Sequence, residues 1–237
     1  MSLDEILRDL FPAGHAVRRE GALLVGTGRS AAVDVAVIGI CDGAEVGVEE
    51  ALRLSAEVLR VVRDHPGRPI LTLVDTSGQR MSKRDEVLGL NGYLGHLAAC
   101  VELARRAGHR VLALVHGQAV SGSFLALGML ADEIHALDGA TLSVMNLPAM
   151  SKVTKIPLDR LEALSRSSPV LAPGLASYVH LGCVASVWRP PLAAELQLAL
   201  ARAPGPDRRS ELGLDRGGRT LAAAVARRVS GATGDGG

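Results

Sequence analysis

Two glycine-rich segments hold the residues of this chain best suited to chemistry. The segment DTSGQR at 75–80 follows the apolar run PILTLVD, and the segment HGQAVSGS at 116–123 follows the apolar run RVLALV. Glycine allows the backbone to approach a ligand closely, and a helix that begins after such a turn leaves backbone N–H groups without partners. Two such turns side by side could direct two N–H groups at one oxygen atom that gains negative charge during a reaction.

The elements that must position these turns alternate between strand and helix, which predicts a parallel sheet. Strands are expected at 69–75, 110–115, 133–137 and 184–188, with two more in 23–41. Helices are expected at 49–64, 86–107, from 122 onward, and at 157–164, 175–181, 191–203 and 219–229. Because parallel strands end at a common edge, where such sheets bind ligands, we expect both turns at that edge.

Composition excludes several classes of protein. The 237 residues are 48% hydrophobic but only 2% aromatic, and 26 basic against 25 acidic residues give a net charge of +1, so bulk charge does not predict nucleic-acid binding. No run approaches 18 apolar residues, and the acidic N-terminus does not resemble a signal peptide. Cys41, Cys100 and Cys183 lie too far apart for a zinc spacing or a disulfide framework, which favours a cytoplasmic location.

Known cofactor and nucleophile motifs are absent from the sequence. There is no G-x-S-x-G, Walker A, H-E-x-x-H or paired C-x-x-C sequence. Gly26, Gly28 and Ala31 fit G-x-G-x-x-A, but the β-branched run at 33–40 predicts a strand where a dinucleotide site needs a helix. We therefore expect no metal or nucleotide cofactor in this chain.

Two other groups of residues allow a functional interpretation. Ser121 opens a predicted helix and could be a nucleophile with His116 or His135 as its base, but a triad is defined by geometry and not by sequence. Arg80, Lys83 and Arg84 follow the first turn and could bind a phosphate or a carboxylate. Solvated surface is the more common role of such residues.

The two turns also carry a resemblance. The stretches LVDTSGQR and VLALVHGQAVSGSFLALGMLADEIHALDGATLSVM, at 73–80 and 111–145, resemble the carboxyltransferase branch of the crotonase superfamily. In that branch one strand ends in Asp-Thr-Pro-Gly and a later one in a turn with Ser-Gly-Gly; here Ser77 replaces the proline and Ser123 the second glycine. The turn HGQAVSGSF and the stretch SVMNLPAMSKVTKIP resemble malonate decarboxylase gamma subunits more than acetyl-CoA carboxylase alpha subunits.

The resemblance implies an α/β fold of the crotonase-like (ClpP/crotonase) type, a ββα spiral with C-terminal helices. We expect an N-terminal helical segment at 1–22 and the crotonase-like domain at 23–204. A linker and C-terminal helix at 205–229 and a disordered tail at 230–237 would follow.

The resemblance further implies a decarboxylase subunit, a carbon–carbon lyase. With a homologous beta subunit it would convert malonyl thioester to acetyl thioester and carbon dioxide. The substrate would be bound as a thioester to the CoA-derived phosphopantetheine arm of an acyl carrier protein subunit. An acyl carrier transferase subunit would load this carrier protein.

The implied oxyanion donors are the backbone N–H groups of Gly78 or Gln79 and of Ser121 or Gly122. Ser77, Gly117 and Gln118 would bind the substrate. The stretch SVMNLPAMSKV contains no Asp or Glu, whereas crotonase hydratases carry an acidic residue there, and this argues against hydration. Two alternatives stay open: an alpha-type subunit that moves carboxyl between an acyl-CoA and biotin, and an interaction subunit without catalysis.

Overall fold

The computed structural model describes residues 1–167, 172–203 and 205–232. The chain divides into two compact units, one made of Met1–Val144 with Ser186–Gly205 and the other of Met145–Ala185 with Pro206–Gly237. The domain boundaries expected from the sequence stay a prediction. The tail predicted over 230–237 lies outside the described residues from 233 onward, and its first three residues complete a helix.

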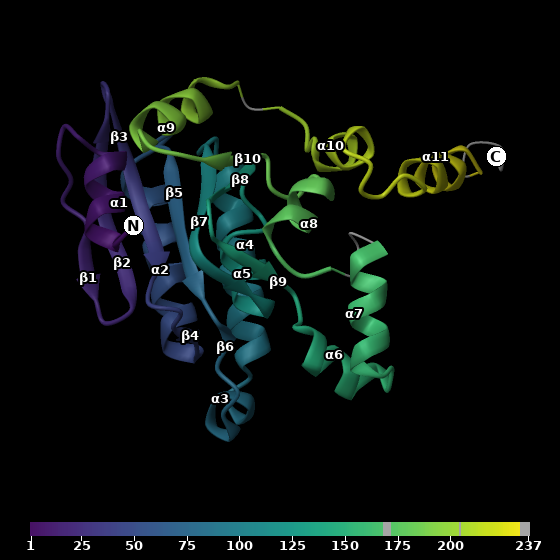
Figure 1. Cartoon of the computed structure of the whole chain (residues 1–237). Coiled ribbons are helices and arrows are strands. Elements are labelled where there is room, and N and C mark those ends of the chain that lie inside the picture. Colours follow the sequence, from purple (N-terminus) through teal and green to yellow (C-terminus); the bar gives the residue numbers. More distant parts are fainter. Residues whose placement is uncertain (168–171, 204, 233–237) are drawn as a thin grey trace. The chain divides into compact units, whose positions relative to one another are not determined.

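The first unit is built on one large sheet, in the order β1-β2-β3-β5-β7-β8-β10, with β9 paired to β7 beyond the end of β8 (Figure 1). Its strands are β1 (Arg18–Glu20), β2 (Leu23–Ser30), β3 (Val33–Ile40), β5 (Ile70–Thr76), β7 (Val111–Val120), β8 (Glu133–Leu137), β9 (Thr141–Ser143) and β10 (Ser186–Trp188). Strands β2 and β3 form an antiparallel hairpin, and β3, β5, β7, β8 and β10 run parallel. The α/β prediction and its parallel sheet are confirmed.

Helices cover both faces of this sheet (Figure 1). Helices α1 (Leu3–Leu10) and α9 (Leu192–Ala201) pack on one face, and α2 (Val48–Asp64) and α4 (Leu90–Arg106) lie on the other. Helix α1 begins with a capping box, in which the Ser2 hydroxyl accepts from Glu5 N at 3.3 Å and Glu5 Oε2 accepts from Ser2 N at 2.7 Å.

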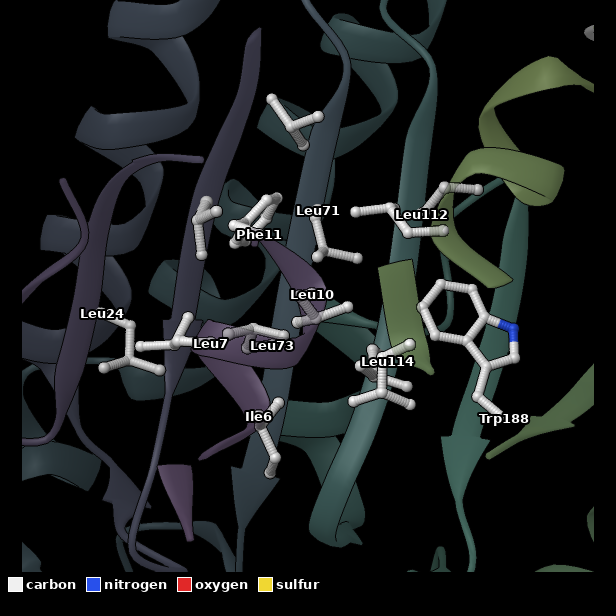
Figure 2. Close-up of a cluster of buried hydrophobic side chains, with 14 of the residues drawn as sticks. Ile6, Leu7, Leu10, Phe11, Leu24, Leu71, Leu73, Leu112, Leu114 and Trp188 are labelled. Atoms are coloured by element: carbon white, nitrogen blue, oxygen red, sulfur yellow. The ribbon is translucent and has the colours of Figure 1, made fainter. Parts of the chain in front are cut away.

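The core under α1 and α9 follows from the two-residue period of the strands. Figure 2 labels ten of its members: Ile6, Leu7, Leu10, Phe11, Leu24, Leu71, Leu73, Leu112, Leu114 and Trp188. Alternate side chains of β5 and β7 therefore face α1, and those between them face α2 and α4. Packing is tight, since a Cβ on Gly28 would lie 2.4 Å from a ring carbon of Phe11. Gly28 of the G-x-G-x-x-A pattern thus serves packing.

Three expectations about secondary structure were wrong in detail. The helix predicted over 86–107 is broken into α3 (Lys83–Val87) and α4, because Gly89 takes the left-handed conformation with φ 78°. The strand predicted over 110–115 extends to Val120, so that Gly117 and Gln118 are strand residues. A short second sheet of β4 (Glu45–Val46) and β6 (Gly78–Gln79) lies where a plain turn was expected.

The second unit is helical. Its helices are α6 (Leu147–Thr154), α7 (Leu158–Ser167), α8 (Leu175–His180), α10 (Arg209–Asp215) and α11 (Ala222–Ala232). Helices α6 and α10 were not predicted, although Asn146 caps α6 by accepting from Ala149 N at 2.8 Å. The Arg216 guanidinium ties the end of α10 to α8 and to the segment after it by donating to three carbonyls at 2.8–2.9 Å. In the described part of the chain, no helix has the length and apolarity that crossing a membrane requires.

Candidate active site

The two glycine-rich turns lie side by side, as the sequence predicted. The first continues β5 into β6, and the second joins β7 to α5 (Ser121–Leu127). Thr76 is paired with Ala119 at the point where the β5–β7 ladder becomes irregular. A Cβ on Gly78, whose φ is 121°, would lie only 3.3 Å from the Cβ of Ser121. The carboxyl edge of the sheet therefore brings both turns into contact.

Three polar contacts lie between the two turns. Asp75 Oδ1 accepts from Gln118 N at 2.8 Å, and the hydroxyls of Thr76 and Ser123 lie 3.2 Å apart. In the third contact, Gln79 Oε1 accepts from Gly122 N at 3.0 Å. Asp75, Thr76 and Ser123 were not predicted as site residues. Their signal in the sequence was their place within the two glycine-rich segments, where Asp75 and Thr76 also fit the Asp-Thr-Pro-Gly pattern.

The two predicted substrate-binding residues in β7 have a structural role. A Cβ on Gly117 would lie 2.3 Å from Asp75 Oδ1 and 2.4 Å from its Cγ, so the Asp75 carboxylate occupies the space above this glycine. The N–H of Gln118 holds that carboxylate. Both residues therefore support the arrangement of the two turns, and substrate binding by them, or by the exposed Ser77, stays a prediction.

The four predicted backbone donors differ in their present partners. The N–H of Gly78 donates to Thr76 Oγ1 at 3.1 Å, and that of Gly122 to the Gln79 side chain. Because Arg80 N bonds to Val46 O across the β4–β6 pair, the N–H of Gln79 faces away from β4. Ser121 is the first residue of α5, so its N–H has no partner within the helix. Ser121 also has a φ of 57°, in the left-handed region that residues other than glycine rarely adopt.

The two arginines after the first turn are paired with glutamates of α2. Arg80 donates to Glu50 Oε1 at 2.9 Å, and Arg84 pairs with Glu49. The Asp85 carboxylate is buried, accepts from Ser82 Oγ at 2.7 Å and from Val48 N at 3.2 Å, and these bonds lower its pKa. Arg80 and Arg84 thus hold α2 and α3 beside the turn. Their pairing gives no support to a phosphate-binding role.

The structure contradicts a triad of Ser121 with His135. His135 is fully buried, stacks on Trp188 with ring centroids 4.5 Å apart, and contacts Ser186 Oγ through Nδ1 at 2.9 Å. Its Nε2 lies 3.3 Å from Glu133 Oε2 without a hydrogen bond of regular geometry. Burial lowers the pKa of His135 and so disfavours its charged form.

His116 gives the nucleophile hypothesis no support either. Burial lowers its pKa, while the nearby charge of Asp75 opposes this shift. Within residues 1–167, 172–203 and 205–232, no hydrogen bond links Ser121 Oγ to a histidine. In the same ranges, no three or more His, Cys, Asp or Glu side chains gather where they could hold a metal ion.

Solved structures place this fold in a known class. The chain matches a transcarboxylase 12S core with a TM-score of 0.68 at 18% identity, over 86% of this chain and 42% of the other. It matches the beta subunit of geranyl-CoA carboxylase from P. aeruginosa with a TM-score of 0.65 at 18% identity, over 86% and 43%. The fold is therefore that of the crotonase-type carboxyltransferases.

More specific matches identify the family within this class. Residues 41–233 match the family model of the malonate decarboxylase gamma subunit, and the chain belongs to this family. It is also 27% identical to a chain of a Pseudomonas malonate decarboxylase hetero-tetramer in complex with coenzyme A. That match has a TM-score of 0.81 and covers 96% of this chain and 97% of the other. The resemblance read from the sequence is thereby confirmed.

Curated relatives match over shorter stretches. The chain is 36% identical over 148 residues to the malonyl-S-ACP:biotin-protein carboxyltransferase of Malonomonas rubra, covering 59% of this chain and 51% of the relative. It is 30% identical over 143 residues to the carboxyl transferase subunit alpha of acetyl-coenzyme A carboxylase from Shouchella clausii, covering 60% and 40%. The chain thus spans about half the length of these relatives or less.

Proposed function

We propose that this chain is the gamma subunit of a malonate decarboxylase and forms, with a homologous beta subunit, the site that decarboxylates malonyl thioester. The observation that carries the proposal is the contact between the β5–β6 and β7–α5 turns in a chain of this family. A Pseudomonas malonate decarboxylase hetero-dimer contains a chain 28% identical to this one over 96% of its length, which supports a heteromeric assembly. The substrate would be carried by an acyl carrier protein subunit, itself loaded by an acyl carrier transferase subunit.

Decarboxylation of a malonyl thioester needs few catalytic side chains. When the carbon–carbon bond to the carboxylate breaks, carbon dioxide leaves and the bonding electrons form a thioester enolate. The N–H groups of the two turns would hold the enolate oxygen, with Gln79 and Ser121 or Gly122 as donors from opposite sides. A proton then adds to the carbon atom and gives acetyl thioester. We assign its donor to the partner subunit, since no acidic side chain follows β9 in this chain before Asp159.

The test compares Gly122→Val with Ser121→Ala in complexes shown to be intact by gel filtration. A side chain at Gly122 would sit 3.3 Å from Gln79 Oε1 and 3.5 Å from Leu94 Cδ1, and the larger valine would fill the space before the N–H. Loss of one such donor reduces the rate by about a hundredfold to a thousandfold. Ser121→Ala keeps the N–H and should cost less than about tenfold. An inactive Ser121→Ala complex would restore the nucleophile hypothesis, and a fully active Gly122→Val complex would favour an interaction subunit.

Carboxyl transfer to biotin is the second candidate function. It is favoured by the relative from Malonomonas rubra, whose name describes transfer from malonyl-S-ACP to a biotin protein. Avidin separates the two functions, because it sequesters biotin and would stop only a biotin-dependent reaction. Carbon dioxide release that is unaffected by avidin supports the decarboxylase.

A further inference from the structure

The Gln79 side chain occupies one of the two backbone donors that the proposed chemistry offers on the second turn. Its Oε1 accepts from Gly122 N at 3.0 Å, at the start of α5. An amide oxygen has two lone pairs and partial negative charge, and so accepts this hydrogen bond as a thioester carbonyl oxygen would. While the bond is present, the N–H of Gly122 is already engaged and a substrate oxygen must compete for it.

The amide of Gln79 is held firmly on one side only. Its Nε2 contacts Met81 Sδ at 4.0 Å, a weak acceptor on a side chain that is 75% exposed. The Gln79 side chain is half-buried and has three rotatable bonds. The backbone, in contrast, is fixed beside β4 by the bond from Arg80 N to Val46 O at 2.9 Å. The side chain can therefore rotate away while the backbone of the turn stays in place.

We propose that Gln79 is a placeholder, whose amide oxygen occupies the position of the thioester oxygen on Gly122 and leaves when the substrate binds. This inference rests on the proposed function and deepens it. A neutral thioester oxygen only replaces one neutral hydrogen bond by another. The enolate oxygen makes a charge-assisted bond, which is about twice as strong. Gln79 thus adds the same cost to every oxygen ligand, which a neutral oxygen only offsets and the charged enolate oxygen exceeds.

The test uses Gln79→Ala and the nearly isosteric Gln79→Glu in the complex purified through a tag on this chain, with malonyl-CoA as substrate. Gln79→Ala removes the competing acceptor and should lower KM about fivefold, the factor that corresponds to about 1 kcal/mol, with kcat within about twofold. Gln79→Glu places a charged acceptor on Gly122 N, which a neutral substrate oxygen displaces less readily, so KM should rise at least about tenfold.

A KM that falls in Gln79→Ala and rises in Gln79→Glu distinguishes this role from a purely structural one, in which the Gln79 side chain would clamp the two turns together. A clamp lost in Gln79→Ala would loosen the site, and KM would rise or kcat would fall. An unchanged or higher KM in Gln79→Ala overturns the inference, as does a Gln79→Glu complex with the KM of the wild type. If the wild-type complex releases no carbon dioxide, the proposed function itself fails. If it is active and Gly122→Val is not, an unchanged KM in Gln79→Ala overturns only the placeholder.

Discussion

Gly117→Ala is the substitution whose effect the structure defines most sharply. The added Cβ would lie 2.3 Å from Asp75 Oδ1, 2.4 Å from Cγ and 2.9 Å from Oδ2, so the carboxylate must move by about 1 Å to reach ordinary contact distance. That movement breaks the 2.8 Å bond that Asp75 accepts from Gln118 N. One of the three polar contacts between the two turns would be lost.

The magnitude follows from this lost bond. A hydrogen bond to a charged group contributes about 1.5–3 kcal/mol to stability. In a chain of this size each 1 kcal/mol shifts the melting temperature by about 2–4 °C, so Gly117→Ala should lower it by about 3–12 °C. A shift of the N–H donors by a similar distance, of about 1 Å, should also reduce decarboxylation about a hundredfold.

The assay is thermal denaturation of the purified complex together with its rate of carbon dioxide release. Gly92→Ala in α4 is the matched control, because a Cβ there meets nothing within 4 Å and alanine favours the helix by about 1 kcal/mol. Its melting temperature should stay unchanged or rise. A Gly117→Ala complex with the wild-type melting temperature and rate would refute the assignment of Asp75 as a link between the turns.

Three further predictions concern the support of the site, acid stability and metals. Asp85→Ala should lower the melting temperature by about 4 °C or more, because it leaves Ser82 Oγ and Val48 N without their acceptor. Arg84→Ala is the control and should leave the melting temperature unchanged. Equal effects of the two substitutions in a thermal shift assay would contradict this prediction. Burial lowers the pKa of both His116 and His135, so the unfolded chain binds more protons than the folded chain below about pH 6.5. The free energy of unfolding should therefore keep its full value above about pH 6.5 and decrease as the pH falls below it. Melting curves at pH 7.5 and 5.0 check this, and His135→Gln should reduce the loss; an unchanged loss would remove His135 from the explanation. Elemental analysis should find no stoichiometric zinc or magnesium in this chain, since the sequence has no ligand spacing for either, and a metal that tracks with activity would overturn this.

Much of the architecture could be predicted from local sequence. The apolar runs at 69–75 and 110–115 became β5 and β7, and the two runs within 23–41 became the β2–β3 hairpin. Helix α2 was expected over 49–64 and spans Val48–Asp64. Such elements can be predicted because burial on a sheet face or a helix face makes apolar residues recur with the period of the strand or the helix. The glycine turns could be found for the same reason, since glycine marks where the backbone needs conformational freedom.

Short and irregular elements could not be predicted in this way. Strands β4 and β6 have two residues each and exist only because they pair with each other. The break between α3 and α4 depends on the left-handed Gly89, while Gly92 and Gly95 in the same repeat stay helical. Identical residues with the same spacing therefore have different conformations, and only the tertiary packing around them decides which one breaks the helix.

The sequence by itself determined which segments form the longer strands, where the two turns lie and which family the chain resembles. The tertiary structure decided which backbone donors are engaged. The Thr76 hydroxyl takes the N–H of Gly78, two residues away, and the Gln79 amide takes that of Gly122, 43 residues away. The sequence allowed the hypothesis that Ser121 and His135 form a catalytic pair, but in the structure His135 packs against Trp188 and Ser186. Hydrogen bonds are directional and short, so partners distant in sequence are fixed only when the sheet brings β5 and β7 together.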